Sequence, residues 1–421
     1  MIQSPTIHRR RFPVHLRRWD SGLPTYLACI SNPSWRERFF RQLRKTISTG
    51  VDALQLDEVY HWHKGCVCRH CREKFFRETG WRVPMNECDP AWQDPLSPFM
   101  RRWRDWRIRD CTNFFVELRR RAKDVNPHLV LSAYTYTGGL VSSASGDIGQ
   151  ELLDLSRTIN FFGVEVMSRS VLRSARAELP LRRAQNIFAF AYGAPVWDWY
   201  YNADAATDYA AWAMSEMTCQ SPMLSDVPAA PGIPNYAGFG VAQGAMSRVG
   251  AEPVAEVALF FSSHTRDLNV EERWVPALFG IAQALEALHV PYVFVPDVNL
   301  TAKRLAAYKV LVLTGVEHLT DADRRLLEGF ERSGGRIARG IARAEEFCQR
   351  SLLDNPYSAV PDIYDFNPDP AAEREFRERV RSAVGDAGWW RMDAPDRVMT
   401  SVWREKSGAL AIHFLNLTGV K

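Results

Sequence analysis

The chain has 421 residues, of which 46% are hydrophobic and 24% charged, and these ordinary values exclude intrinsically disordered, collagen-like and disulfide-scaffold classes. Its net charge of +4 is too small to indicate a nucleic-acid partner. A run of about 18 apolar residues is absent, so we expect no membrane partner, and the arginine-rich N-terminus has no apolar segment behind it that would form a secretory signal, so we expect a cytoplasmic protein.

Residues 1–250 alternate short apolar runs with amphipathic, arginine-rich segments. A long helix is predicted over Pro98–Asp124, because its aromatic residues recur at helical spacing. The apolar runs predict strands at Val51–Leu56, Leu129–Tyr134, Ile159–Val166, Ile187–Tyr192 and Pro222–Ser225. This alternation indicates parallel strands joined by helical crossovers, as in a barrel or a doubly wound sheet. Since a closed barrel needs eight strands, we expect a (β/α)₈ (TIM) barrel that lacks its first strands.

A loop and linker rich in Pro, Gly and Ala, residues 226–250, separates this region from a second α/β region. There, strands are predicted at Glu256–Ser262, Pro291–Val295, Tyr308–Thr314 and Arg336–Gly340, and helices at Trp274–Leu288 and Asp321–Ser333. This order predicts a flavodoxin-like domain over residues 251–395, similar in outline to class I glutamine amidotransferases. The alternating tail Met399–Leu417 predicts two antiparallel strands that begin a β domain, residues 396–421.

Three cysteines, Cys66, Cys68 and Cys71, fall within six residues. This crowding favours a metal ion in a reducing compartment over disulfides. A structural Zn²⁺ site needs four ligands in tetrahedral geometry, and the fourth ligand is open among Cys29, Cys88, Cys111 and a nearby histidine. The alternative is a set of three buried free thiols.

Further motifs around this cluster resemble glycoside hydrolase family 42, the β-galactosidases with a zinc-bearing barrel. They are Cys29–Ser34 before a basic helix, the segment Leu54–Val59, and Cys66–Cys71. The resemblance implies structural zinc, an oligosaccharide substrate and a family acid/base position at Glu58. It also implies that the four zinc ligands are Cys29, Cys66, Cys68 and Cys71.

The second α/β region resembles the trimerisation domain of the same family. The matching pieces are Val257–Ser262, Tyr308–Leu313 and Gly334-Gly335. The resemblance implies a homo-oligomer, specifically a trimer.

The chain departs from the family pattern at two places. Asp57 stands where the family has an asparagine, and no carboxylate occurs near Ala189–Tyr192, where the family's nucleophilic glutamate is expected. A sister group, glycoside hydrolase family 151, joins the same trimerisation domain to an α-L-fucosidase-like barrel. Resemblance to that group implies Asp57 as the nucleophile and Glu165 as the acid/base.

Glycoside hydrolysis needs two carboxyl groups, and in a parallel barrel these lie at the carboxyl ends of strands. Asp57 and Glu58 end one predicted strand, and Glu165 lies in the apolar run Phe161–Met167. A helix cap or an arginine salt bridge is the alternative for the first two. For Glu165, the alternative is pairing with Arg169 or Arg173, because an unpaired buried carboxylate is costly.

Aromatic and histidine side chains near the predicted strand ends are candidates for binding sugar. Trp197, Trp199 and Tyr200 would stack on a pyranose ring while Asp198 binds a hydroxyl; the alternative is an aromatic plug at the end of the barrel. His61 and His63 would bind substrate hydroxyls, or else support the zinc cluster or lie on the surface.

These features together predict an exo-acting glycoside hydrolase that removes terminal galactose or fucose from an oligosaccharide by a retaining, two-carboxylate mechanism. The alternative is a catalytically inactive carbohydrate-binding or scaffold protein of the same fold. A zinc-dependent hydrolase is disfavoured, because four thiolate ligands leave no open position on the ion for water.

Overall fold

The computed structural model describes the following residues: 28–57, 59, 61, 66–86, 88–94, 96–134, 149–166, 183–184, 186–193, 195–200, 205–224, 250–268, 274–348, 369–387, 390 and 392–418. The chain divides into two compact units. The first consists of Met1–Gly139 and Ser143–Phe162, and the second of Leu140–Ser142 and Gly163–Lys421. The predicted domain boundaries near residues 250 and 395 stay predictions.

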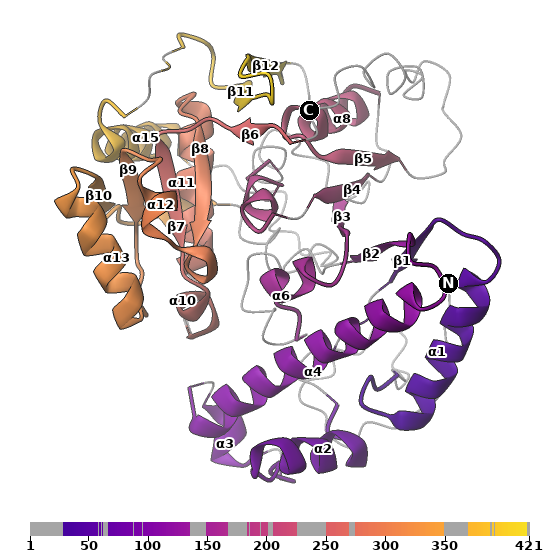
Figure 1. The fold of residues 1–421 in the computed structure, drawn as a ribbon. Helices are drawn as coiled ribbons and strands as arrows, with labels where there is room; N and C mark the ends of the chain where they lie inside the picture. Colours follow the sequence, from indigo (N-terminus) through magenta and orange to yellow (C-terminus); the bar gives the residue numbers. More distant parts are fainter. Residues whose placement is uncertain are drawn as a thin grey trace. The chain divides into compact units, whose positions relative to one another are not determined.

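The first unit is organised around α4 (Pro98–Lys123), a helix of 26 residues (Figure 1). Ser97 begins the helix by accepting a hydrogen bond from the Met100 backbone N–H at 3.1 Å, and Pro98 occupies the first turn, where no N–H is needed. Basic residues in the last turn complement the negative end of the helix dipole. Among the described residues, α4 is contacted by α1 (Pro33–Ile47), α2 (Arg69–Thr79), α3 (Pro90–Gln93) and α6 (Leu152–Ser156).

Aromatic packing accounts for the helical spacing of the tryptophans. The Trp103 and Trp106 rings stack at 5.1 Å, and the Phe75 ring of α2 meets both edge-on, at 4.9 and 5.4 Å. All three side chains are essentially inaccessible to solvent. Burying rings of this size supplies much of the hydrophobic stabilisation in a small helical layer.

Five strands form one sheet in the order β1-β2-β3-β4-β5. Their bounds are β1 Ala53–Leu56, β2 Val130–Tyr134, β3 Phe161–Val166, β4 Val196–Tyr200 and β5 Ser221–Leu224. The pairs β1–β2 and β4–β5 are parallel, and α4 connects β1 to β2 in the chain while α6 (Leu152–Ser156) lies between β2 and β3. The expected α/β class with parallel strands is therefore confirmed. Among the described residues, β1 and β5 are the sheet edges, so the sheet does not close into a barrel.

One predicted strand was wrong. Residues 186–191 are helical, and the strand lies instead at β4, in the aromatic run that was expected to follow a strand. The segment from Asn186 to Ala189 is buried throughout. A short run that is apolar on every side has no periodicity, and such a run does not distinguish a buried helix from a buried strand.

A second parallel sheet follows residue 250, in the order β10-β9-β7-β8 (Figure 1). Its strands are β7 Val257–Phe261, β8 Tyr292–Pro296, β9 Val310–Leu313 and β10 Arg336–Arg339, each within a few residues of its predicted position. The helices of this region are α10 Ser263–Leu268, α11 Trp274–Ala287, α12 Ala302–Leu305, α13 Asp321–Arg332 and α15 Pro370–Val384, with short 3₁₀ turns η4 Asp297–Asn299 and η5 Ala344–Phe347. The four strands and their helices match the predicted alternation.

The predicted antiparallel tail is also confirmed. Strands β11 (Val398–Arg404) and β12 (Leu410–Asn416) pair antiparallel, and β6 (Glu252–Pro253) pairs with β11 on the other side. The side chains of Leu410, Ile412 and Phe414 are exposed along the edge strand β12. Helix α8 (Ala205–Met217) contacts β12. None of the helices in the described residues is both long and apolar enough to cross a membrane.

Candidate functional site

Four cysteine side chains converge in the first unit. The Cys29 Sγ lies 3.4 Å from the Cys71 Sγ and 3.6 Å from the Cys68 Sγ, and the Cys68 and Cys71 sulfurs are 3.9 Å apart. Together with Cys66, all four sulfurs lie within 4.8 Å of one another. Four thiolates at ~2.3 Å from a tetrahedral Zn²⁺ would lie about 3.8 Å apart. The donor set and its spacing therefore fit a structural zinc ion.

Two helix starts hold the cluster in place. Cys68 immediately precedes α2 and Cys71 lies in its first turn, so both sulfurs gather at the same helix end. Cys29 stands just before α1, where the Asn32 backbone N–H donates to the Cys29 carbonyl at 3.0 Å. Cys29 and Cys71 are 2% and 0% exposed, against the aromatic residues of α2 and α4. Apolar surroundings of this kind exclude water from these two sulfurs, while Cys66 and Cys68 are partly exposed.

Hydrogen bonds between the four thiols shift their pKa values. Hydrogen bonding to Cys66 raises the pKa of the Cys29 thiol, and bonding to Cys29 lowers the pKa of the Cys66 and Cys68 thiols. Hydrogen bonding within the cluster, together with burial, raises the pKa of Cys71. The sulfurs thus resist full ionisation together unless a cation offsets their mutual repulsion, as a divalent metal ion does.

The positions of the sulfur atoms identify the fourth cysteine of the cluster. Cys29 joins the cluster, as the family resemblance implied. Cys88 is exposed and Cys111 is buried within α4, and neither belongs to the cluster. Burial raises the pKa of the Cys111 thiol, so this residue stays a neutral core side chain.

A buried carboxylate on α4 forms a second polar centre in the same unit. Asp110, 1% exposed, accepts hydrogen bonds at Oδ2 from the Ser31 hydroxyl at 2.6 Å and from the His61 Nε2 at 2.9 Å. Its Oδ1 accepts from the Lys74 ammonium. Burial opposes ionisation of Asp110, but the bonds from His61 and Lys74 outweigh it and hold its pKa well below the usual range.

His61 is therefore placed inside the fold. It is 3% exposed and lies 5.8 Å from the Trp106 ring, and the Arg107 guanidinium donates to its carbonyl at 3.3 Å. Burial lowers the pKa of the imidazole, against the opposing effect of Asp110. His61 is thus a neutral donor to Asp110. Its imidazole bonds to Asp110 on α4, and the predicted contact with substrate hydroxyls stays a prediction.

Of the predicted carboxylates that the structure describes, one follows a strand and the other lies within a different strand. Asp57 directly follows β1 and is exposed, although partial burial raises the pKa of its carboxyl. Glu165 is a residue of β3, and Trp197, Asp198, Trp199 and Tyr200 are residues of β4. Only the strand positions of these five residues are described. Glu58 and His63, like the arginines named as partners of Glu165, lie outside the described residues.

Sequence reasoning missed Asp110, Ser31 and Lys74. The signal for Asp110 is present: it stands four residues after Trp106 and four before Phe114, on the apolar stripe of α4. A lone aspartate on a buried helix face requires hydrogen-bond or charge partners. Its partners come from segments far apart in the chain, and periodicity alone does not identify them.

The fold of the chain is similar to that of solved β-galactosidases, and the expected resemblance to family 42 is confirmed at the level of the fold. The chain is similar to the β-galactosidase of the Antarctic haloarchaeon Halorubrum lacusprofundi, with a TM-score of 0.57 and 14% identity over 80% of this chain and 60% of that one. It is also similar to the cold-adapted β-galactosidase of Rahnella sp. R3, with a TM-score of 0.54 and 13% identity over 75% of this chain and 56% of that one.

A third similar structure is a catalytic mutant of Gan42B, a GH42 β-galactosidase from G. stearothermophilus, with a TM-score of 0.54 and 11% identity over 77% of this chain and 59% of that one. The chain spans between 56% and 60% of the length of these three enzymes. No protein-family model matches the sequence, and no curated protein does. At these identities the likeness is one of fold.

Proposed function

We propose that this chain is a glycoside hydrolase that removes a terminal galactose or fucose from an oligosaccharide. The observation that carries the proposal is the similarity of its fold to the β-galactosidases, at TM-scores up to 0.57. The four-cysteine cluster supports it independently, because the family resemblance named those four residues from sequence. The alternative is a carbohydrate-binding or scaffold protein without activity. The lack of a carboxylate near Ala189–Tyr192 no longer favours it, because residues 186–191 are helical and do not end a strand.

In the proposed mechanism, the Asp57 carboxylate attacks the anomeric carbon and forms a glycosyl ester. Glu165 protonates the departing glycosidic oxygen, then removes a proton from the water that hydrolyses the ester, which retains the anomeric configuration. In the galactosidase-like variant of this proposal, Glu58 is the acid/base. Trp197, Trp199 and Tyr200 would stack on the sugar ring, while Asp198 and His63 would bind its hydroxyls.

The proposed zinc ion would be held by Cys29, Cys66, Cys68 and Cys71. When bound, it supplies structural cross-linking rather than catalysis, since four thiolates fill a tetrahedral coordination shell. His61 is proposed as a positioning residue that joins α4 to the segment following β1, through Asp110. We also propose a trimer formed through the flavodoxin-like region and a cytoplasmic location; light scattering coupled to size exclusion tests the trimer.

The proposal is tested by hydrolysis of 4-nitrophenyl β-D-galactoside and 4-nitrophenyl α-L-fucoside by the full chain. Asp57→Asn and Glu165→Gln are each expected to lower kcat by at least about a thousandfold. Glu58→Gln has the same effect in the galactosidase-like variant alone. Asp52→Asn, at the other end of β1, is the matched control and is expected to retain activity.

The results distinguish an active glycosidase from a carbohydrate-binding protein without activity. Turnover of one glycoside, abolished at Asp57 and Glu165 and kept in the Asp52 control, identifies the sugar and the catalytic pair of carboxylates. Rescue of the Asp57→Ala variant by azide, with formation of a glycosyl azide of inverted anomeric configuration, would confirm the nucleophilic role. Absence of turnover on both glycosides, combined with measurable binding of galactose or fucose, would favour the carbohydrate-binding alternative.

A further inference from the structure

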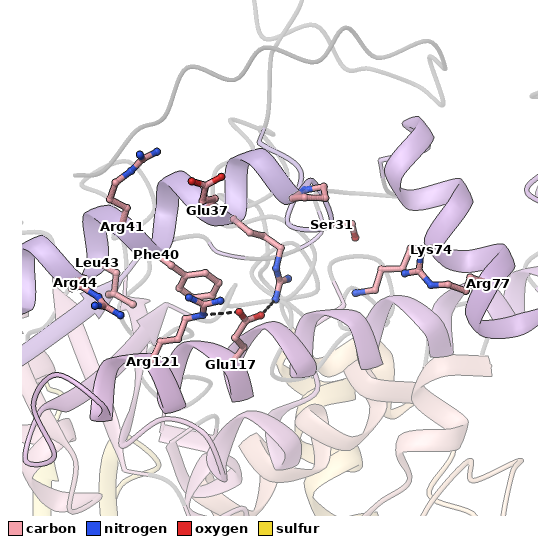
Figure 2. Close-up of a pocket in the computed structure, with 12 residues that line it drawn as sticks. Ser31, Glu37, Phe40, Arg41, Leu43, Arg44, Lys74, Arg77, Glu117 and Arg121 are labelled. Carbon is pink, nitrogen blue, oxygen red and sulfur yellow. Dashed lines mark hydrogen bonds and ion pairs between the residues drawn. The ribbon is translucent and has the colours of Figure 1, made fainter.

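A basic cavity of about 590 Å³ lies in the first unit. Helices α1, α2 and α4 and the segment before α1 contribute its walls (Figure 2). Its charged lining residues are Arg36, Arg41, Arg44, Lys74, Arg77 and Arg121 on the positive side and Glu37 and Glu117 on the negative side. Asp57 is not among the lining residues. A volume of this size is typical of a small-molecule site, between roughly 300 and 1,000 Å³.

The lining is unbalanced in charge. Six cations and two carboxylates line the cavity. Lys74 is also paired with Asp110 and Arg77 lies 4.0 Å from Glu78, so counting these two partners leaves an excess of two positive charges. Glu117 accepts from both Arg36 and Arg121, so its single charge is shared by two guanidinium groups. The guanidinium groups of Arg41 and Arg44 have no partner within the described part of the chain. Repulsion among these cations is relieved by a bound anion.

Several of these cations are held in fixed positions. The Arg36 guanidinium donates to the Ile30 carbonyl at 3.0 Å and lies 4.9 Å from the Phe114 ring centroid. The Arg121 guanidinium lies 4.5 Å from the Phe40 ring centroid. In Figure 2, a dashed line joins the Glu117 carboxylate to the Arg121 guanidinium. Side chains already ordered before binding lose little rotamer entropy when a ligand arrives.

The end of the cavity near α2 is anchored to the buried carboxylate described above. Ser31 and Lys74 line the cavity, and both donate to Asp110. Ser31 is 7% exposed, so its hydroxyl lies at the protected end of the site. The Lys74 ammonium therefore lines the cavity, and its bond to Asp110 fixes its position. Fixed guanidinium and ammonium groups around one space are the chemistry that recognises carboxylate, sulfate and phosphate oxygens.

We propose that this cavity binds a small ligand bearing an oxyanion, at a site separate from the hydrolytic centre. Arg44 on α1 and Arg77 on α2 contribute binding charge from two different walls of the cavity. The volume admits a sugar-sized molecule that carries the anionic group, as well as a free oxyanion. The proposal does not depend on glycosidase activity, because every residue that carries it lies outside the proposed catalytic set.

The test is isothermal titration calorimetry of the full chain at low ionic strength, with inorganic phosphate, glucose 6-phosphate and glucose as the three probes. Saturable binding is expected for at least one of the two phosphates, and none for glucose. The double variant Arg44→Gln/Arg77→Gln is expected to weaken phosphate binding by about tenfold or more. Arg38→Gln/Lys45→Gln, which removes two exposed α1 cations outside the cavity, is the matched control and is expected to stay within about twofold.

The outcomes separate the sources of the oxyanion. Binding of both phosphates supports a site for an anionic sugar-sized ligand, and binding of inorganic phosphate alone supports a free-oxyanion site. Absence of saturable binding by the wild-type chain would overturn the proposal. Equal weakening in the two double variants would also overturn it, since it would reflect net charge rather than the cavity. Circular dichroism of each variant verifies that the helices are intact.

Discussion

At the scale of single residues, the cysteine cluster makes the most direct prediction. Cys68→Ser replaces a thiolate with a hydroxyl that binds zinc poorly, so we expect purified protein to lose its zinc. The unfolding free energy should fall by roughly 3 kcal/mol or more, because metal binding to the folded state is linked to folding. Metal content by inductively coupled plasma mass spectrometry and urea unfolding measure the two effects.

Cys88→Ser is the matched control for this variant, because Cys88 is exposed and outside the cluster. It should leave the zinc content and the unfolding midpoint unchanged. Chelation of the wild-type protein should reproduce the loss of stability seen in Cys68→Ser. A wild-type protein that contains no zinc, and whose stability is insensitive to chelator, would contradict the assignment.

His61 makes the stability of the fold depend on pH. Burial lowers the pKa of His61 below its ordinary value of 6.5. As the pH falls through about 6.5, the unfolded chain binds a proton that the folded chain still excludes, so stability is lost on acidification. The slope attributable to this residue is at most about 1.4 kcal/mol per pH unit. Asp110, whose pKa is lowered, contributes stability that is lost only in stronger acid.

The measurement is the urea-unfolding free energy at pH 7.5 and at pH 5.5, for wild type and for His61→Gln, whose amide still donates to Asp110. We expect the variant to lose less stability between the two conditions than the wild type does. His128→Gln, which removes an exposed histidine, should behave as the wild type. Equal losses in wild type and His61→Gln would show that His61 is not the group responsible.

These two polar centres differ in how far sequence anticipates them. The cysteines could be predicted because the C-x-C-x-x-C spacing confines three sulfurs to a few residues, and the family resemblance supplies Cys29. The environment of Asp110 could not be predicted, because its partners Ser31, His61 and Lys74 meet only after α1, α2 and α4 have packed together. Local spacing therefore identified the metal ligands, while tertiary packing determines the carboxylate network.

At the scale of elements, the capping of α13 gives a prediction for the second unit. The Thr320 hydroxyl accepts from the Asp323 backbone N–H at 3.1 Å, and the Asp323 carboxylate accepts from the Thr320 backbone N–H at 3.0 Å. This reciprocal pair satisfies two donors at the start of the helix. Thr320→Ala should lower the unfolding free energy by about 1 kcal/mol, measured by urea unfolding. Thr320→Ser, which keeps the hydroxyl, should restore most of it.

Helices and strands were predicted correctly where one face of the element is exposed to solvent or where glycines mark its end. Helix α13 has an amphipathic face and is followed by Gly334-Gly335, and its bounds were predicted to within one residue. The strand prediction for residues 186–191 was wrong because these residues are buried on nearly all sides. Their apolar pattern therefore shows no helical periodicity. Strand β4 was missed for a related reason, since Trp, Tyr and an aspartate resemble a binding loop as much as a strand.

At the scale of the whole molecule, strand β12 predicts self-association. Its side chains Leu410, Ile412 and Phe414 are 44%, 38% and 58% exposed, and β12 is an edge strand of its sheet in the described residues. Exposed apolar edge strands pair with other chains. Phe414→Lys should raise the temperature at which light scattering begins by several degrees. Val116→Lys, at an exposed position on α4, is the control and should have little effect.

An unchanged scattering onset in Phe414→Lys would show that this edge does not nucleate association. A binding partner that covers β12 would give the wild type the same protection as the substitution. Dynamic light scattering at several protein concentrations distinguishes a specific oligomer, which reaches a plateau in size, from open-ended growth.

The cysteine cluster has a consequence for the order in which the first unit assembles. Cys29 and Cys71 are 42 residues apart in the chain, and β1 lies between them. An ion that binds both ends closes this segment into a loop, and a cross-link of that span removes denatured-state entropy equivalent to about 4 kcal/mol. The start of α1, strand β1 and the start of α2 would then be tethered before α4 is in place. Refolding in the presence of zinc should therefore be faster than refolding in chelator, because the most distant contacts of this segment no longer depend on chance encounter.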